Sequence, residues 1–227
     1  MIVSIHQPQY LPWLPYFSKI AGCDVFVFLD EVQFQKNGLQ NRNELKNSQG
    51  RFWLTIPISA NLGDSLNDVN IANQKWSLKH EKSIYLNYHN AQNYKFFIDH
   101  IQKPMKKDSN LVDLNIEIIE KISHHYFNIN TKFVRQSSLS INGKGSDLIL
   151  NICKQLGAKQ YLSGPGGKNY IIEEEFKQSG ISIAYYKNHL PKEYPQLFNK
   201  VGFINNLSAI DFILNVESSN RDNFLQL

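Results

Sequence analysis

The sequence contains little cysteine. Its two cysteines, Cys23 and Cys153, lie far apart and form no CxxC pair. A disulfide framework and a cysteine-based zinc motif are therefore not expected. His124 and His125 have no acidic neighbour at ligand spacing, so no metal site is predicted from them either.

Long apolar runs are also missing. No stretch approaches the roughly 20 residues of a membrane-spanning helix. The apolar start, Met1 to Ile5, leads directly into polar His6 and Gln7, which is not the pattern of a secretion signal. The sequence therefore predicts a cytoplasmic protein that does not insert into a membrane.

The excess of positive charge is small and dispersed. Lysine and arginine total 24 against 20 acidic residues, for a net charge of +4, with no basic run. This excludes DNA as an expected partner, because a general nucleic-acid binder carries a concentrated basic patch. It does fit a pocket for a phosphate or a carboxylate. An aminoacyl-tRNA donor stays open, since this charge permits it.

The residues that are present predict a globular α/β fold. Hydrophobic residues make up 42% of the 227 residues, enough for a sizeable core. The runs Ile2–Ile5 and Val25–Leu29 read as buried strands on either side of a helix, Tyr16–Ala21, that ends at Gly22. A strand, a helix and a second strand form a βαβ unit, which places its two strands parallel.

The rest of the chain extends this unit into one domain, 1–227, with a Rossmann-like, mostly parallel sheet and flanking helices. Asn41–Lys46 and Phe52–Pro57 predict an inserted β-hairpin. A helical insertion at roughly 75–127 either packs beside the sheet or caps it. The remaining predicted strands are Lys132–Arg135, Gln160–Leu162 and Ile181–Tyr185, and the remaining helices are Gly145–Leu156, Tyr170–Gln178 and Ala209–Asn215, the last opened by a capping box of Ser208 and Asp211.

The first candidate site follows the first strand directly. Ligands of open parallel sheets bind beyond the carboxyl ends of the strands, and His6 occupies that position. A histidine there can act as a general base or contact an anion. The alternative is a structural histidine inside a proline-rich loop. From the same loop, substrate contacts are predicted for Gln7, Tyr10 and Trp13.

The second candidate site joins the end of the second strand to the hairpin. It is rich in cations and amides, which satisfy acceptor oxygens of carboxylates and phosphates. The alternative is a polar hairpin edge whose charges prevent aggregation. The predicted contacts are Asp30, Gln33, Lys36, Asn41, Arg42, Asn43 and Lys46.

The third candidate site is a glycine-rich turn between a strand and a helix. Its glycines let backbone amides approach an anion, although the spacing is not that of a Walker A motif. The alternative is a tight turn without a ligand. The predicted contacts are Ser163, Gly164, Gly166, Gly167, Lys168 and Tyr170.

A fourth group lies on the helix that begins near Trp76. Lys79 and His80 fall on different faces of this helix, and the residues alone favour an ordinary amphipathic helix with a basic outer face.

Together these motifs resemble the WbqC-like family over nearly the whole chain. The resemblance rests on His6-Gln7-Pro8-Gln9-Tyr10-Leu11-Pro12-Trp13, Asn41-Arg42-Asn43, Trp53-Leu54-Thr55-Ile56-Pro57, Trp76 with Lys79-His80, Tyr161-Leu162-Ser163-Gly164 with Gly167-Lys168, and Tyr194-Pro195-Gln196. It implies a role in bacterial O-antigen (lipopolysaccharide) or other surface-polysaccharide pathways and in the synthesis of unusual amino sugars. It also raises Lys79 and His80 to candidate catalytic residues, and Gln196 to a substrate contact. One departure is Pro15, which stands where the family pattern has glycine.

A second likeness is to pantothenate synthetase-like adenylating enzymes. It is limited to the opening βαβ unit and the run Val32-Gln33-Phe34. Those enzymes carry paired histidines in the first loop for the phosphates of the nucleotide. This chain has only His6 there, so the resemblance does not extend to that ATP site.

The hypothesis that follows is a transferase acting on a nucleotide-linked amino sugar by acyl or aminoacyl transfer to the sugar amine. His6 would be the general base, and Lys36 or Lys79 would stabilise an oxyanion. The donor would be an acyl-CoA or an aminoacyl compound. Two alternatives are an ATP-dependent adenylating or nucleotidyl-transferring enzyme and a non-catalytic protein that binds a sugar nucleotide or a pathway partner.

Overall fold

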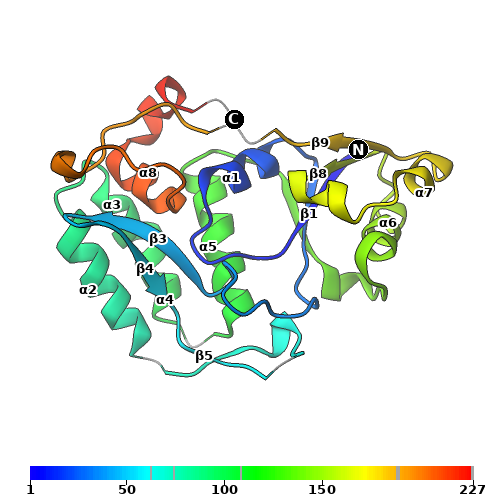
Figure 1. Ribbon diagram of the computed structural model, residues 1–227, viewed down its shortest axis with the longest axis horizontal. Helices are drawn as coiled ribbons and strands as arrows, with labels where there is room; N and C mark the ends of the chain where they lie inside the picture. The colour runs from blue at the N-terminus through cyan, green and yellow to red at the C-terminus, as the bar shows by residue number, and fades with distance from the viewer. Residues whose placement is uncertain (62, 74, 108, 188–189, 226–227) are drawn as a thin grey trace.

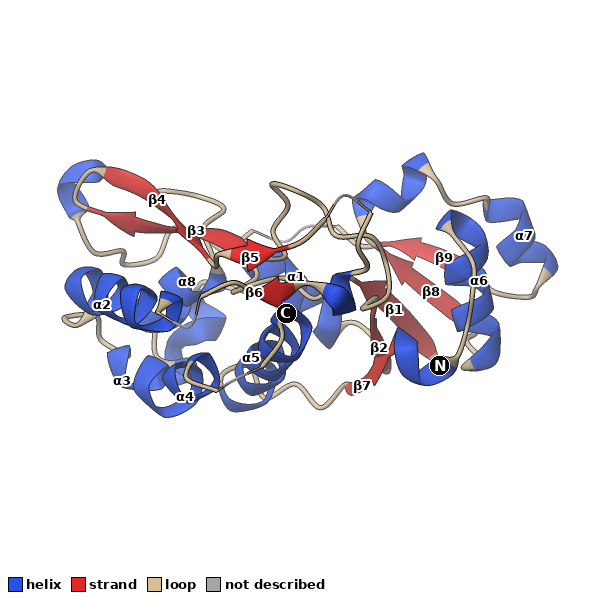
Figure 2. Ribbon diagram, turned by 90° about the horizontal axis from the view of Figure 1, so that it is seen from below, coloured by secondary structure: helices blue, strands red, loops and turns tan. Residues whose placement is uncertain are grey.

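A computed structural model describes residues 1–61, 63–73, 75–107, 109–187 and 190–225. Its centre is a five-stranded sheet of order β7-β2-β1-β8-β9, in which all neighbours pair in parallel (Figure 2). The predicted α/β class with a parallel sheet is therefore confirmed. The strands are β1 (Ile2–His6), β2 (Val25–Phe28), β7 (Lys132–Arg135), β8 (Gln160–Ser163) and β9 (Ser182–Tyr185).

Both faces of the sheet are covered by helices, as a βαβ fold requires. Residues of β2 alternate between two cores: Val25 and Val27 pack with helices α6 (Gly145–Gln155) and α7 (Glu173–Gln178), while Phe26 and Phe28 face the opposite side. On that side lie α1 (Leu14–Ala21) and α5 (Leu111–His125) (Figure 2). This alternation is the period of two expected of a strand buried on both faces.

The helical middle packs beside the sheet rather than capping it. Phe17 of α1 lies 5.1 Å from Phe127, and His124 of α5 lies 5.8 Å from Phe133 of β7, measured between ring centroids. Further from the sheet lie α2 (Trp76–Tyr88), α3 (Tyr94–Phe96), a π-helical segment (Phe97–Ile101) and α4 (Gln102–Met105) (Figure 1).

The hairpin forms as predicted, from β3 (Arg42–Asn47) and β4 (Gly50–Thr55), with Gly50 at φ 121° in the turn. A second antiparallel pair, β5 (Ile58–Ser59) and β6 (Asn70–Ile71), was not predicted, because two residues are too few to show a period. Both pairs lie on the same side of the sheet as α5, with α8 (Ala209–Asn215) nearby (Figure 2).

Two local predictions were wrong in part. The glycine turn does not lead directly into a helix at Tyr170: a 3₁₀ helix, Pro165–Asn169, comes first and α7 begins only at Glu173. The capping box at α8 is half formed. Ser208 Oγ accepts a hydrogen bond from the Ile210 amide at 3.2 Å, but the Asp211 carboxylate turns into the core and accepts from other side chains.

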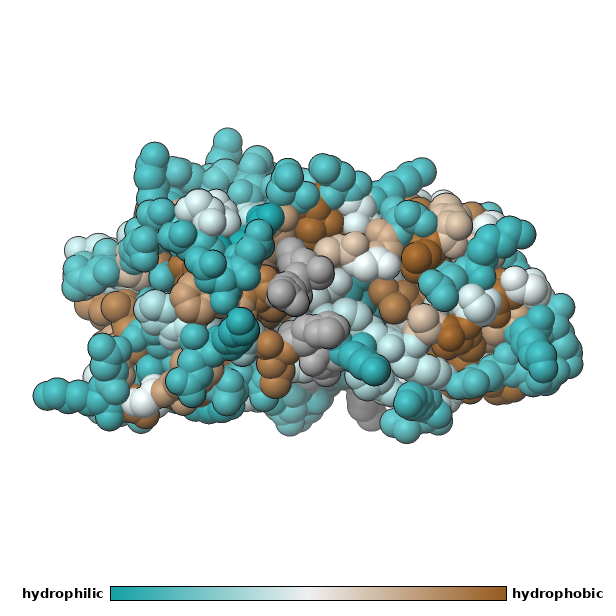
Figure 3. Space-filling model, turned by 90° about the horizontal axis from the view of Figure 1, so that it is seen from above, coloured by the Kyte–Doolittle hydropathy of each residue, from teal (hydrophilic) through white to brown (hydrophobic). Residues whose placement is uncertain are grey.

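The described helices include none that is long and apolar enough to span a bilayer. On the face shown in Figure 3, hydrophobic residues occur in small groups among hydrophilic ones.

Candidate functional site

The strand order defines where a ligand of this fold binds. From β1 the chain proceeds to β2 on one side, and after β7 it crosses to β8 on the other, so the topological switch point lies between β1 and β8. Their register ends at the pair Ser4 and Leu162, beyond which the strands separate. His6 ends β1 and Ser163 ends β8, so both predicted residues lie at this switch point.

A lysine occupies the point where the two strands part. The Met1 carbonyl accepts from the Lys159 amide at 2.9 Å, so the odd-numbered carbonyls of β1 face β8. The Ile5 carbonyl instead accepts from Lys19 Nζ at 2.9 Å. Lys19 belongs to the last turn of α1, and helical side chains lean toward the helix N-terminus. Its amine thereby reaches the carboxyl end of the sheet.

The charge of Lys19 has no counterion. The residue is 5% exposed and takes part in none of the ion pairs found in the described ranges. Burial lowers the pKa of the amine to about 8. The neighbouring Cys23 thiol has a pKa raised to about 12 by burial and stays neutral. An isolated buried ammonium costs several kcal/mol, which an anionic ligand offsets.

His6 lies beside this amine in a defined tautomer. Nδ1 is 3.0 Å from the Gln7 carbonyl, which can only accept, so Nδ1 carries the hydrogen. Burial and the nearby Lys19 charge lower the pKa of His6 to about 4. The ring is therefore neutral at pH 7, and its Nε2 lone pair has no partner among the described residues. A neutral ring with an uncommitted Nε2 can accept a proton from a ligand, and its low pKa makes it a weak base while no ligand is bound.

The glycine turn lies against the same amine. A β-carbon at Gly167 would overlap Ser163 Oγ, so this position tolerates no side chain. At Gly164 a β-carbon would meet only Lys19 Nζ, at 3.9 Å. Packing therefore does not require glycine at 164; its missing side chain leaves space over the ammonium group. Lys168 Nζ lies 5.0 Å from the centre of the Tyr185 ring, and Tyr170 is exposed.

A separate cavity of about 860 Å³ holds four of the residues predicted from the second motif. Its described lining comes from two segments that flank the hairpin, 33–42 and 55–63, and includes Gln33, Lys36, Asn41 and Arg42. Asn41 Nδ2 donates to the Ile56 carbonyl at 2.9 Å, which leaves its side-chain oxygen uncommitted.

Other predicted site residues are engaged inside the protein. Tyr10 donates its hydroxyl to His80 Nδ1 at 2.9 Å, and His80 Nε2 donates to the Thr55 carbonyl at 3.2 Å. Burial lowers the pKa of His80 to about 4, so the ring stays neutral and both nitrogens are used. This pair supports Thr55, which lines the cavity. Tyr10 and His80 thus sit behind the cavity wall.

Asn43 and Asp30 hold neighbouring backbone segments in place through side-chain hydrogen bonds. Asn43 Nδ2 donates to the Leu11 carbonyl at 2.7 Å. The Asp30 carboxylate accepts from the amide of Ser137 at 3.0 Å and from its hydroxyl at 2.6 Å. Asp30 thereby connects the segment after β2 to the segment after β7.

Lys46 and Gln196 belong to a buried polar network around Asp211. Lys46 Nζ donates to the Gly202 carbonyl at 2.6 Å and to Gln196 Oε1 at 3.2 Å. Gln196 Nε2 donates to Asp211 Oδ2 at 2.8 Å. The Lys46 amine therefore lies away from Arg42, although both belong to β3.

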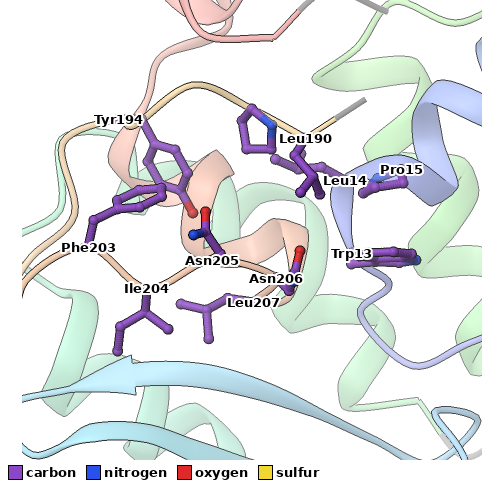
Figure 4. A pocket seen from close by; sticks show the side chains of 11 residues that line it. Trp13, Leu14, Pro15, Leu190, Tyr194, Phe203, Ile204, Asn205, Asn206 and Leu207 are labelled. Atoms are coloured by element: carbon purple, nitrogen blue, oxygen red, sulfur yellow. The ribbon is translucent and has the colours of Figure 1, made fainter. Parts of the chain in front are cut away.

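Trp13 and Lys79 lie apart from both groups. Trp13 lines a small apolar groove between the start of α1 and the segment 190–207, where Tyr194 and Phe203 form the opposite side (Figure 4). Lys79 is exposed on α2 and takes part in none of the ion pairs between described residues.

Lys19 is a candidate site residue that the sequence analysis did not single out. A lysine in the last turn of a helix ordinarily complements the helix dipole, and the sequence alone favours that interpretation. The one signal for it is its place in the first helix after β1. No group of three or more potential metal ligands occurs in the described part of the chain.

Comparisons with known proteins agree on the family. The pattern of the WbqC-like protein family matches residues 7–223. The chain is also 28% identical over 224 residues to an uncharacterized protein of Mycobacterium tuberculosis, Rv1507c, covering 97% of this chain and 96% of that protein.

Proposed function

The chain belongs to the WbqC-like protein family, and on that premise we propose that it modifies a nucleotide-linked amino sugar by acyl or aminoacyl transfer to the sugar amine. Membership of the family suggests a role in polysaccharide-associated biosynthesis. The finer proposal, a transferase of O-antigen or another surface glycan, draws its support from the residues around the switch point.

The observation that carries the proposal is the buried, uncompensated Lys19 amine at the switch point. The Ile5 carbonyl needs one hydrogen-bond donor there, and a neutral side chain could supply it without the cost of burying a charge. A lysine is suited to a ligand that brings negative charge, such as a diphosphate. Gly164 leaves the approach to this amine open, and Gly166, Gly167 and Lys168 line the turn beside it.

The proposed chemistry uses His6 as the base. The amine nitrogen of the sugar attacks the acyl carbonyl of the donor, a carbon–nitrogen bond forms, and the bond to the leaving group breaks. His6 Nε2 takes the proton from the nitrogen and returns it to the leaving group. A diphosphate beside Lys19 would raise the pKa of His6 above its low value in the free protein, making it a stronger base. Of the two lysines predicted to stabilise the oxyanion, Lys36 lines the cavity and would take this role, whereas Lys79 lies apart from both groups and is not assigned it.

An adenylating or nucleotidyl-transferring enzyme is the second candidate, because the strand order β7-β2-β1-β8-β9 is that of nucleotide-binding doubly wound sheets. Magnesium dependence and release of pyrophosphate would identify it. A protein that binds a sugar nucleotide tightly and shows no turnover with acyl-CoA, aminoacyl or ATP donors would instead be a binding protein.

The test is calorimetric titration of the protein with dTDP-, UDP- and GDP-linked amino sugars. We expect one of them to bind. The Lys19→Met variant should bind it at least about 30-fold more weakly, because the diphosphate of the ligand loses the positively charged amine that pairs with it. Gly164→Ala should also weaken binding by placing a methyl group over the amine. Lys154→Met, which removes an exposed lysine of α6, is the matched control and should bind normally.

Equal binding by wild type and Lys19→Met would refute the phosphate assignment. Full turnover by His6→Ala would refute the assignment of the base.

A further inference from the structure

The large cavity has the dimensions of a small-molecule site. Its volume of about 860 Å³ lies within the range of roughly 300–1,000 Å³ typical of ligand pockets. Phe34 and Ile58 supply apolar contact surface, while amides and cations supply polar groups. The described lining combines residues that are distant in sequence, brought together where the segment after β2 passes the end of β4.

Arg42 is held in place on this lining. Its Nη2 donates to the Asn37 carbonyl at 2.5 Å, and its guanidinium carbon lies 4.4 Å from the centre of the Trp53 ring. Its Nε has no hydrogen-bond partner among the described residues and is buried rather than exposed to the cavity. The arginine is thus oriented in advance.

The charge in the cavity is of one sign. Lys36 is the second cation on the lining, and the described lining contains no carboxylate. Neither Arg42 nor Lys36 takes part in an ion pair with another described residue. The nearby Asp64 carboxylate accepts from the Asn61 amide at 2.6 Å. Two cations on a described lining that has no carboxylate favour an anionic occupant.

One buried glutamine connects the cavity to the switch point. Gln40 Nε2 donates to Gln7 Oε1 at 2.6 Å, and Gln40 Oε1 accepts from the Gln35 amide at 3.1 Å. Gln7 follows His6 directly, and Gln35 lines the cavity. The two sites are therefore distinct, and this pair of hydrogen bonds links their linings.

We propose that this cavity binds the second substrate, the group donor, through a carboxylate or phosphate held by Arg42. Lys36 adds a second positive charge, and Phe34 and Ile58 contact the apolar part of the donor. The identity of the occupant as a donor rests on the proposed function, whereas anion binding at Arg42 rests on the cavity alone.

The experiment titrates the protein with succinate as the carboxylate probe and with inorganic pyrophosphate as the phosphate probe. Heat of binding is measured together with tryptophan fluorescence, because Trp53 stacks on Arg42 and is 46% exposed. We expect Arg42→Gln to weaken binding of the preferred probe at least about 10-fold and Lys36→Gln about 3-fold. Lys36 is exposed, so its replacement leaves folding intact.

Arg51→Gln is the matched control. It removes one guanidinium from the same hairpin, where Arg51 pairs with Glu44 outside the cavity, and it should bind the probe as the wild type does. The preferred probe identifies whether the group bound is a carboxylate or a phosphate. Wild-type affinity in both Arg42→Gln and Lys36→Gln, or no binding of either probe with a dissociation constant below about 10 mM, would overturn the proposal.

Titration with UDP separates the two proposals. Loss of UDP binding in Lys19→Met with probe binding intact would place the two anions in different sites, as we expect. If UDP and every sugar nucleotide fail to bind while the probe still depends on Arg42, the cavity site stands and the proposed function fails. If the probe depends on Lys19 and not on Arg42, the cavity assignment fails and the switch-point site stands.

Discussion

Lys19 carries its charge where a charge destabilises the folded protein. Its pKa falls from 10.5 to about 8 on burial, a shift equivalent to about 3 kcal/mol against folding at neutral pH. The penalty is fully present below pH 8 and disappears as pH rises through 10.5. A residue that lowers stability and has no counterion is typical of a functional site.

The prediction is that Lys19→Met unfolds at the same temperature as the wild type or a higher one. The substitution removes the buried charge and leaves only the Ile5 carbonyl without its donor, which costs about 1–3 kcal/mol. Thermal unfolding at pH 7 without ligand measures the difference. A loss of more than about 2 kcal/mol would instead make Lys19 a structural residue.

At this scale His6 could be predicted as a candidate site residue from the sequence. The position of Lys19 at the switch point could not. His6 could be placed because a residue directly after a buried strand must lie at the carboxyl edge of the sheet. The position of the Lys19 amine depends on how α1 packs on β1 and β8, which no local pattern encodes. For the same reason Arg42 and Lys46, four residues apart in β3, could not be assigned in advance to a cavity and to a buried network.

At the scale of elements, Asp211 joins segments that are remote in sequence. It accepts hydrogen bonds from Tyr88 of α2 at 2.6 Å, from Tyr194 at 2.7 Å and from Gln196 at 2.8 Å. Tyr88 in turn accepts from the backbone amide of Lys46 in β3 at 2.9 Å. Burial raises the pKa of Asp211, and these donors and the Lys46 charge oppose that shift.

We expect Tyr194→Phe to lower the free energy of unfolding by about 1.5–3 kcal/mol, because a bond to a charged acceptor is lost. Asp211→Ala should cost about 3–5 kcal/mol, since it leaves the Lys46 charge and the tyrosine hydroxyls without their partner. Urea denaturation measures both values. Tyr85→Phe, an exposed tyrosine of α2, is the control and should change little. Equal effects of Tyr85→Phe and Tyr194→Phe would contradict the role of the network.

Element boundaries followed from local chemistry where that chemistry was strong. Helix α2 begins at Trp76, where the sequence predicts a helix to start, and Gly157, at φ 68°, follows the end of α6. Within the predicted helical insertion, residues 94–105 are helical throughout but contain a π-helical segment. Pro104 explains the segment, because its ring would clash with the carbonyl of His100 in a regular α-helix. Such a defect follows from one residue, but its exact form depends on packing.

At the scale of the whole molecule, the parallel arrangement of the strands in the sheet could be predicted from the sequence. The contacts between distant segments that form the cavity and the groove could not. Two apolar runs with a helix between them imply parallel order, and β7, β8 and β9 extended the sheet as expected. The cavity forms because residues 33–42 lie against 55–61 and 63, and the groove at Trp13 forms against residues 190–207. These contacts span distances in sequence over which local propensity carries no information.

The protein as a whole should lose stability in mild acid because the fold holds two histidines in neutral form. His6 and His80 both have their pKa lowered from 6.5 to about 4. Between these values the unfolded chain binds more protons than the folded one, so stability falls as pH decreases through this window and is retained above pH 6.5. His80, 6% exposed, alone should contribute a loss of about 2 kcal/mol between pH 7 and pH 5.

Urea denaturation at pH 7 and pH 5 measures this loss, and His80→Gln isolates its source. Glutamine can still accept from Tyr10 and donate to the Thr55 carbonyl, but it does not titrate, so the variant should lose about 2 kcal/mol less than the wild type over the same interval. His89→Gln removes an exposed histidine and should leave the pH dependence unchanged. An identical pH dependence in wild type and His80→Gln would show that the pKa of His80 is the same in the folded and unfolded protein, so that the folded ring is protonated at pH 5. The Tyr10 hydroxyl could then no longer donate to Nδ1, and the support of the cavity wall at Thr55 would have to come from elsewhere.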